Sequence, residues 1–248
     1  VHNPLLRDNT AKASCAVTTN NKKSNHGGDH FMIPFFFGED WTKVLPLVAL
    51  QYHDVEIRVK CRDGFTPNTT PKVYGNYAYL DTEERKYFTD TEHELLITQT
   101  QHQLASNTDT EIDLTYFNHP VKSVHLVSGK ATGNDWDSEF TFQKSSLYIN
   151  GVPLFEDTSN VYHHTVVPEM HSTDLPDDIL EDLPTFTWPF CLNLSKMQPT
   201  GTLNFSRIDN AKLALVGPTG GNALHRIYAV NYNVLRIKNG MAGVAFGN

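Results

Sequence analysis

Apolar and polar residues alternate with a period of two in several segments of the chain after about residue 31. In residues 55–59, Val55, Ile57 and Val59 alternate with charged residues. Because successive side chains of a strand point to opposite faces, this pattern predicts strands with one face in a core and the other in water. Further segments with strand character lie at 77–80, 111–116, 121–127, 140–149 and 186–194.

Helical signals are brief by comparison. Residues 81–85 begin with Asp-Thr-Glu-Glu, which predicts the capped start of a short helix, and residues 173–183 could form one or two more turns. Gly, Pro, Asn and Asp separate the many short strands, so we expect an all-β, antiparallel sandwich. Pro189 cannot donate a ladder hydrogen bond, which places its strand at an edge or at a bulge.

The last long strand carries apolar residues on both faces. One face carries Tyr228, Val230, Tyr232 and Val234, whereas Leu235 and Ile237 lie on the other. A strand that is apolar on both faces is expected to be covered on both sides. The Asn-Gly pair that follows at 239–240 predicts a tight hairpin turn.

Composition narrows the possible functions. The 248 residues are 39% hydrophobic, which suffices for one large β domain or two smaller ones. The net charge of -8, and basic runs no longer than Lys22-Lys23, predict no direct contact with nucleic acid. No apolar run approaches the roughly 20 residues of a membrane span, so we expect no direct membrane insertion. Three scattered cysteines favour neither a disulfide framework nor a zinc site: Cys15, Cys61 and Cys191.

Several motifs occur together and in a fixed order from about residue 31 to the end of the chain. The most specific motif is QPTGTLNFSRIDNA at 198–211. The others are IPFFF at 33–37, LPLVALQYH at 45–53, LDTEER at 80–85, FNHP at 117–120, IYAVNYNVLRI at 227–237 and NGMAG at 239–243. In this combination they resemble the major capsid proteins of nucleocytoplasmic large DNA viruses, the group containing the chlorella viruses, iridoviruses and marseilleviruses.

The resemblance implies a double jelly roll, in which two β-sandwiches sit side by side in one chain. Residues 1–92 are then a polar leader loop plus the C-terminal strands of an incomplete first jelly roll, and residues 93–248 are the second jelly roll. The resemblance also implies a homotrimer with a pseudo-hexagonal outline that contacts neighbouring capsomers and minor capsid proteins. Such a protein lies in the capsid of an icosahedral virion, is assembled in the host cytoplasm, and has no catalytic activity or cofactor.

We expect the residues that stabilise the fold and its assembly to lie in the two longest motifs. Arg207 has the phase of Leu203 and Phe205 in the predicted strand, so its charge should be at least partly withdrawn from water. A buried guanidinium needs an acceptor, and Asp209 or a more distant acid is the candidate partner. The full set of candidates is Arg207, Asp209, Asn210, Tyr232, Asn233 and Arg236.

A metalloenzyme on a jelly roll is one rival interpretation. His163, His164, Glu169 and His171 gather in one segment, but no two of the histidines are two residues apart, so a strand would not bring them together. A polar surface loop without metal is favoured. The acidic residues of 174–182 lack the spacing of a calcium loop and are expected to form a solvated face. Neither a nucleophile elbow nor a phosphate-binding loop is present.

A carbohydrate-binding sandwich is the second rival, because aromatic side chains in loops can stack on sugars. Trp41 and Trp136 are the candidates, although packing within the loops is the more common role for such residues. Glycosylation sequons begin at Asn68, Asn193 and Asn204. The last two fall in predicted strands, so Asn68 is the plausible acceptor.

Overall fold

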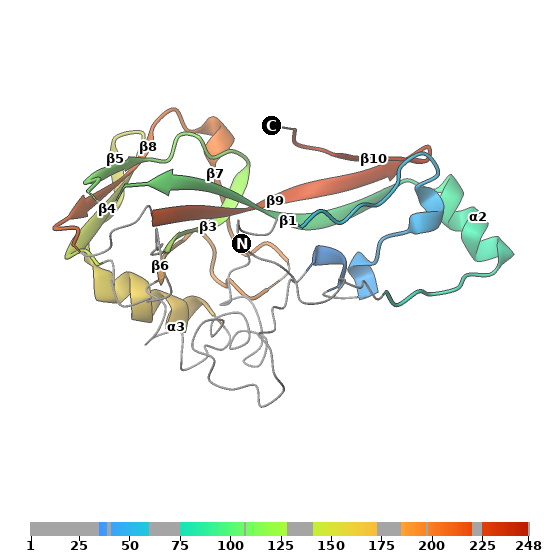
Figure 1. Ribbon diagram of the computed structural model, residues 1–248, viewed down its shortest axis with the longest axis horizontal. Coiled ribbons are helices and arrows are strands. Elements are labelled where there is room, and N and C mark those ends of the chain that lie inside the picture. The colour runs from blue at the N-terminus through green and yellow to red at the C-terminus, as the bar shows by residue number, and fades with distance from the viewer. Residues whose placement is uncertain are drawn as a thin grey trace.

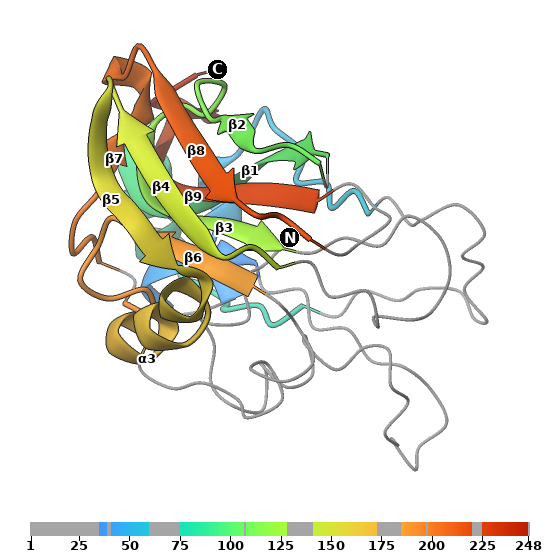
Figure 2. The same ribbon diagram turned by 90° about the vertical axis from the view of Figure 1, so that its left-hand side faces the viewer.

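Antiparallel strands form two sheets that face each other in the computed structural model of the chain (Figures 1 and 2). The structure describes residues 35–38, 41–59, 75–106, 108–127, 141–172, 185–196, 198–219 and 225–247. The six-stranded sheet has the order β1-β9-β3-β6, with β7 paired to β3 and β10 to β9, and the four-stranded sheet has the order β2-β8-β4-β5. The strands are β1 (His93–Ala105), β2 (Glu111–Asp113), β3 (Pro120–Val127), β4 (Lys144–Ile149), β5 (Val152–Ser159), β6 (Thr185–Pro189), β7 (Leu203–Asn204), β8 (Ala211–Val216), β9 (His225–Lys238) and β10 (Met241–Val244).

The chain crosses repeatedly between the two sheets, which is the connectivity of a jelly roll. This confirms the all-β, antiparallel class that the period of two predicts. The helices are short, and among the described residues none is long and apolar enough to span a membrane. They are α2 (Thr82–Asp90), α3 (Val167–His171), the 3₁₀ turns η2 (Phe36–Gly38), η3 (Trp41–Lys43), η4 (Leu47–Ala49) and η6 (Phe205–Arg207), and the π-helical turn η5 (Tyr162–Val166).

The core lies between the sheets and is rich in aromatic residues. Trp188 of β6 is fully buried, and its ring centroid is 6.3 Å from that of Phe142. Phe142 in turn lies 4.6 Å from Phe186, also of β6. Each such side chain removed from water contributes roughly 2–3 kcal/mol, so these contacts are a main attraction between the sheets. The aliphatic residues that complete the core include Ile112, Leu114, Val121, Val124, Leu126, Leu147, Leu213, Leu215 and Ile227.

The predicted strands differ from the observed ones where no neighbouring strand is available. Residues 55–59 form no strand, and Val55, Ile57 and Val59 are 49%, 42% and 61% exposed. The described residues before β1 form no paired strand, so the alternation at 55–59 lacks hydrogen-bonding partners in this part of the chain. The boundary between 1–92 and 93–248, and the incompleteness of a first roll, stay predictions.

Strands β1 and β9 are longer than the sandwich requires. They pair along their whole length, from His93 opposite Ile237 to Ala105 opposite His225. Figure 1 shows that they continue beyond the sandwich as an arm, which is joined by β10 and lies next to α2. The capping box of Asp81 and Glu84 starts α2, confirming the helix start predicted there and extending that helix to Asp90.

The Asn-Gly turn between β9 and β10 also ties an early segment of the chain to the arm. Asn239 and Gly240 have φ angles of 53° and 77°, which suit the tight hairpin turn that the sequence predicts. The Gly240 carbonyl accepts a hydrogen bond from the backbone nitrogen of Tyr52 at 3.0 Å, and Nδ1 of His53 accepts one from that of Ala242 at 2.9 Å.

We expect Gly240→Ala to destabilise the chain by about 1–2 kcal/mol, because a left-handed φ is unfavourable for alanine. The new Cβ would also lie 2.6 Å from the Tyr52 ring, which would have to move. Thermal unfolding should show a melting temperature a few degrees below that of the parent. Gly243→Ala is the matched control, since no atom lies within 4 Å of its Cβ position. Equal melting of the two variants would contradict this account of the turn.

Candidate assembly surfaces

The motif at 198–211 forms a corner instead of one continuous strand. After two residues of β7, the side chain of Asn204 accepts a hydrogen bond from the Ser206 nitrogen at 3.1 Å and starts the 3₁₀ turn η6. Phe205 points into the core, and its ring meets that of Phe117 at 6.3 Å. The turn changes the direction of every side chain after Phe205, so the period of two ends there.

The expectation that Arg207 points toward the core is therefore wrong. Arg207 is the last residue of η6, and its side chain is exposed. Asp209 is exposed as well, and no ion pair joins the two residues in the described part of the chain. The sequence placed Arg207 in phase with Leu203 and Phe205, but that phase requires a strand that η6 interrupts.

Asn150 secures this corner from a neighbouring hairpin. It occupies the turn between β4 and β5 together with Gly151, with φ angles of 49° and 80°. Its Oδ1 atom accepts hydrogen bonds from the backbone nitrogens of Asp209 at 3.1 Å and Asn210 at 3.0 Å. Its own nitrogen donates to the Asn210 carbonyl at 2.7 Å. Neither this turn nor its contact was predicted from the sequence, although the Asn-Gly pair at 150–151 is a typical hairpin signal.

We expect Asn150→Gly to lower the free energy of unfolding by about 1–2 kcal/mol, because two backbone donors lose their acceptor. Glycine keeps the left-handed turn, so backbone strain does not contribute to the loss. Asn150→Asp retains a side-chain oxygen and tolerates the same φ, so it should unfold within about 0.5 kcal/mol of the parent. Urea unfolding measures both. An equal loss in the two variants would show that the acceptor is not responsible.

Tyr232 and Asn233 of β9 stabilise the inside of the protein. Tyr232 is 4% exposed, its ring lies 5.7 Å from Nζ of Lys122, and burial raises the pKa of its hydroxyl to about 12. Asn233 is 1% exposed and donates from Nδ2 to Gln99 Oε1 and to the Phe246 carbonyl, both at 2.9 Å. Its Oδ1 accepts from the Phe246 nitrogen at 3.1 Å. In this chain both residues contribute to the fold.

A row of amide side chains continues from Asn233 across β1 and β9. Gln101 donates from Nε2 to Asn231 Oδ1 at 3.0 Å and to the Asn118 carbonyl at 2.7 Å. Its Oε1 accepts from the Asn118 nitrogen at 3.0 Å. Asn231 is fully buried, so an unpaired amide there would be costly. These bonds also tie the loop before β3 to the long pair of strands.

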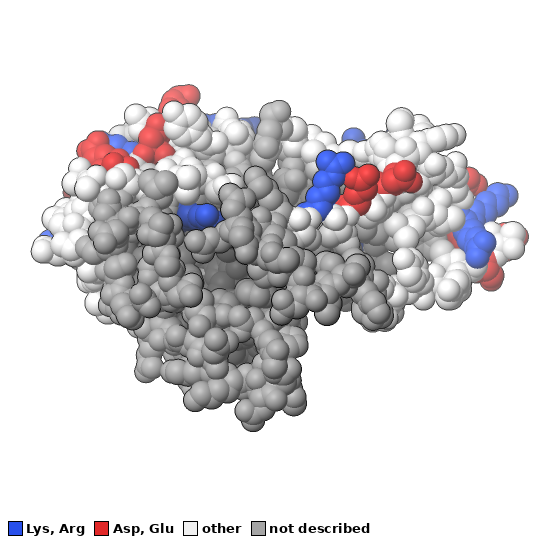
Figure 3. Space-filling view, viewed as in Figure 1, with Lys and Arg blue, Asp and Glu red and all other residues white. Residues whose placement is uncertain are grey.

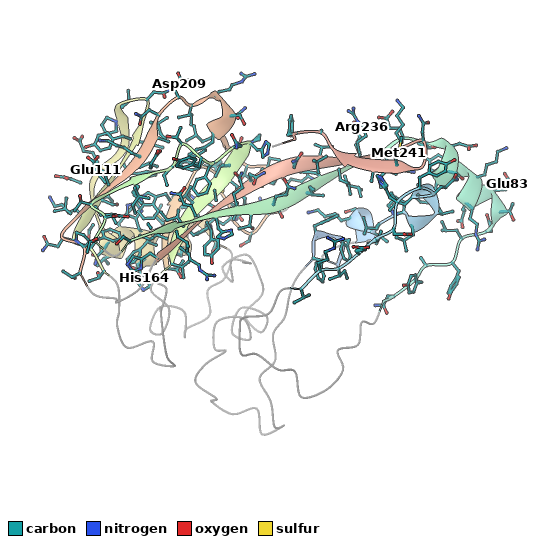
Figure 4. The ribbon with its side chains drawn as sticks, turned by 45° about the horizontal axis from the view of Figure 1, so that its top comes forward. Glu83, Glu111, His164, Asp209, Arg236 and Met241 are labelled. Atoms are coloured by element: carbon teal, nitrogen blue, oxygen red, sulfur yellow. The ribbon has the colours of Figure 1, made fainter. Side chains whose placement is uncertain are left out.

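Arg236 is exposed and already holds acidic partners within the chain. It lies on the arm, far along the molecule from Asp209 (Figure 4). Its Nη2 is 2.6 Å from Glu94 and its Nε 3.2 Å from Glu92, while Lys238 is 2.9 Å from Glu92. The hydrogen bond from Lys238 lowers the pKa of Glu92, and the one to Glu94 raises the pKa of Arg236. Exposed pairs of this kind contribute little to stability.

Charges on the visible surface are mixed in sign. On the face seen in Figure 3, acidic and basic side chains of the described residues occur in small groups and do not form one continuous basic patch. Opposite charges also lie next to each other in two further surface ion pairs, Lys212–Glu111 at 3.1 Å and Lys144–Asp157 at 3.3 Å.

The histidines considered as metal ligands bind backbone carbonyls instead. They lie in η5 and α3, so the prediction of a surface loop is wrong, and His163 is fully buried. Nδ1 of His163 is 3.0 Å from the Thr187 carbonyl, and Nδ1 of His171 is 2.9 Å from that of Cys191. In the described part of the chain, no three His, Cys, Asp or Glu side chains are placed to hold a metal ion.

Other predicted sites fall partly outside the described residues. Asn68, Trp136, the predicted helix at 173–183 and the acidic residues of 174–182 lie there, as does the side chain of Trp41. Asn193 is described, and the strand predicted for it is wrong. It follows the end of β6, and its Oδ1 accepts from the nitrogens of Ser195 and Lys196 at 2.8 and 3.0 Å.

His125 of β3 is a buried titratable group of the sandwich. Its Nε2 is 2.8 Å from Ser123 Oγ and its Nδ1 is 3.0 Å from Thr187 Oγ1. Burial, with a smaller effect of the Lys122 charge, lowers the pKa of His125 to about 3. The ring therefore stays neutral in the folded protein, whereas the unfolded chain takes up a proton near pH 6.5.

This difference predicts acid sensitivity. Because the pKa of His125 is lower in the folded state, its stabilising effect is complete above pH 6.5 and is lost as the pH falls toward 3. Unfolding free energies measured with urea at pH 7.5, 6 and 5 should fall by about 1.4 kcal/mol per pH unit for this group below pH 6.5. His125→Asn cannot titrate and should lower that slope. An unchanged slope would mean that His125 titrates alike in both states.

Comparison with known protein families gives a consistent result. The family model of the large eukaryotic DNA virus major capsid protein matches residues 84–243, and that of the major capsid protein N-terminus matches residues 1–81. The chain is 34% identical over 242 residues to the major capsid protein of Pyramimonas orientalis virus, covering 87% of this chain and 60% of that protein. It thus spans three fifths of that relative's length. It is also 29% identical over 299 residues to the major capsid protein of Paramecium bursaria Chlorella virus 1, covering 88% of this chain and 67% of that protein.

Solved structures share the fold. A chain of the PBCV-1 virus capsid superposes with a TM-score of 0.68 at 23% identity, covering 95% of this chain and 78% of that one. The Faustovirus major capsid protein superposes with a TM-score of 0.50 at 13% identity, covering 64% of this chain and 36% of that one. At these identities the likeness concerns the fold alone.

Proposed function

Because this chain belongs to the large eukaryotic DNA virus major capsid protein family, we propose that it is a structural part of a capsomer in an icosahedral virion. In this proposal three copies form a pseudo-hexagonal homotrimer, which contacts neighbouring capsomers and minor capsid proteins. Assembly takes place in the host cytoplasm, without direct contact to nucleic acid and without insertion into a membrane. The jelly-roll connectivity of β1 to β9 is the observation that carries the proposal, since the solved capsid proteins share this fold.

A structural role also fits the chemistry of the described residues. The histidines that suggested a metal site are engaged with backbone carbonyls, and the polar residues of β9 are used within the chain. The carbohydrate-binding alternative rested on side chains outside the described residues, and no contact in the described part favours it. We therefore propose no catalytic step and no cofactor.

We place the assembly contacts of the 198–211 motif at its exposed corner. Arg207, Asp209 and Asn210 are exposed there, and Arg207 makes no ion pair in the described part of the chain. The Asn150 contacts hold the backbone of this corner at Asp209 and Asn210. An exposed arginine that makes no ion pair with the described residues of its own chain can pair with a carboxylate of another subunit.

Size-exclusion chromatography with light scattering, and images of the purified chain, test the trimer. We expect a particle of three copies with threefold symmetry. A monomer at every concentration from on the order of 1 μM to on the order of 0.1 mM would overturn the trimer proposal.

Substitution of Arg207 tests the corner. Arg207→Ala should melt within a degree or two of the parent, because the side chain is exposed, yet it should form fewer trimers. Arg226→Ala, at another exposed arginine on β9, is the matched control and should assemble normally. Normal assembly of Arg207→Ala would remove Arg207 from the contact, and a large loss of melting temperature would show that its role lies in the fold.

A further inference from the structure

Strand β6 forms one edge of the six-stranded sheet, and a helical segment covers that edge. On one side β6 pairs with β3, from Ser123 opposite Pro189 to Val127 opposite Thr185. On its other side lies the segment of residues 160–171, called here the histidine helix, which includes η5 and α3 (Figure 2). Pro189 is the last residue of β6, so the position of this strand agrees with the edge location that the proline predicts. Open strand edges can pair with strands of other molecules, so such a cover has a protective effect.

Three histidines hold the cover by their side chains. Nδ1 of His164 is 3.1 Å from the Thr185 carbonyl, and Nδ1 of His163 is 3.0 Å from that of Thr187. Residues two apart in a strand direct their carbonyls to the same side, so the two rings take the place of a neighbouring strand. His171 binds the Cys191 carbonyl beyond the end of β6 in the same way. A carbonyl only accepts, so each Nδ1 carries the hydrogen.

The surroundings of His163 suit only the neutral ring. It is fully buried, its ring centroid lies 4.6 Å from that of Trp188 and 5.8 Å from that of Phe155, and its Nε2 has no hydrogen-bond partner among the described residues. A second proton would add a charge and an unsatisfied donor at Nε2. Burial, opposed by the Thr187 hydrogen bond, lowers the pKa of His163 to about 4.

The titratable groups near the histidine helix do not offset that charge in the described part of the chain. Strand β6 itself has none, and no carboxylate of the described residues hydrogen-bonds the His163 ring. The Thr187 hydroxyl binds His125 of β3, which is itself neutral in the fold. The remaining groups on the elements packed here are Lys122 of β3, Glu156 and Asp157 of β5, Tyr162 and His164 of η5, Glu169 and His171 of α3, and Cys191 after β6.

We propose that the histidine helix is an acid-released cover, which leaves the β6 edge when His163 is protonated and exposes a strand edge to pairing with a second copy of the chain. Release breaks the hydrogen bonds to Thr185 and Thr187 and opens the face of Trp188 to water. The histidine helix is short and has no backbone ladder with β6, so it can separate while the two sheets stay together.

The direction of the pH effect follows from the two states of His163. Its stabilising effect on the docked helix is complete above pH 6.5 and is lost as the pH falls toward 4. Between pH 7 and pH 5 the population of the released state should therefore rise on the order of 20-fold.

Hydrogen–deuterium exchange of the whole chain at pH 7, 6 and 5, corrected for intrinsic exchange rates, tests the proposal. We expect amides of residues 160–171 to lose protection on the order of 20-fold from pH 7 to pH 5. Amides of β8, in the opposite sheet, open only when the whole fold unfolds, so they should have clearly higher protection factors than the histidine helix at every pH. If the amides of β8 and of residues 160–171 have equal protection factors at each pH, the whole fold opens together and the idea of a separate cover is wrong.

Substitution identifies the titrating group. In His163→Asn the side-chain nitrogen can still donate to the Thr187 carbonyl but cannot take up a proton in this pH range. For amides of residues 160–171, the ratio of the corrected exchange rate at pH 5 to that at pH 7 should be less than half the parent's ratio. His102→Asn, at an exposed histidine on β1, is the matched control and should keep the parent ratio. A ratio of at least half the parent value in His163→Asn would overturn the proposal.

If His163→Asn does not fold, hydrogen–deuterium exchange of the parent chain alone tests whether the histidine helix is released.

Chemical crosslinking of the parent at pH 7 and pH 5 gives a second readout for the exposed edge. Crosslinks between β6 segments of two copies should increase at pH 5 and return to the starting level at pH 7. Loss of protection without such crosslinks would remove strand pairing from the proposal, and no loss of protection would overturn the release itself.

Discussion

The pairing of β9 with its neighbours is the constraint on which the other features depend. On one side β9 pairs with β1 along its whole length, and on the other it pairs first with β3 and then with β10. Residues 227–233 are buried on both faces, so each polar group there needs a partner inside the protein. The amides of Asn231 and Asn233 find theirs in glutamines of β1 and in backbone groups. A shift of one residue would reverse all of these faces at once, so core packing and the amide row select the same register.

The same pairing connects regions that are distant in sequence. Asn233 binds both backbone groups of Phe246, Gly240 binds Tyr52, and Gln101 binds the loop at Asn118. The arm, the end of the chain and an early segment are therefore all attached to β1 and β9. For a protein proposed to form a shell, such attachments matter because contacts between copies need surfaces that keep their shape.

An asparagine and a histidine side chain have the same structural role at two places in this fold. A backbone group that no strand or helix satisfies is bound by a side chain of fixed position. Asn150 does so for the exposed corner at Asp209 and Asn210, and His163 does so for the buried edge at Thr187. The exposed contact is independent of pH in the physiological range, since an amide does not titrate. The buried one depends on a neutral ring, which couples this edge to acidity.

The sequence by itself determined the all-β class, the capped start of α2, the edge position of Pro189 and the hairpin at Asn239-Gly240. Each of these follows from the period of side chains or from the backbone preference of one or two residues. Only the tertiary structure decided that Arg207 is exposed, that residues 55–59 form no strand, and that His163 is buried against Trp188. Those outcomes depend on neighbours far along the chain: a strand needs a partner for its hydrogen bonds, and a histidine becomes a buried donor only where a carbonyl without a partner meets it.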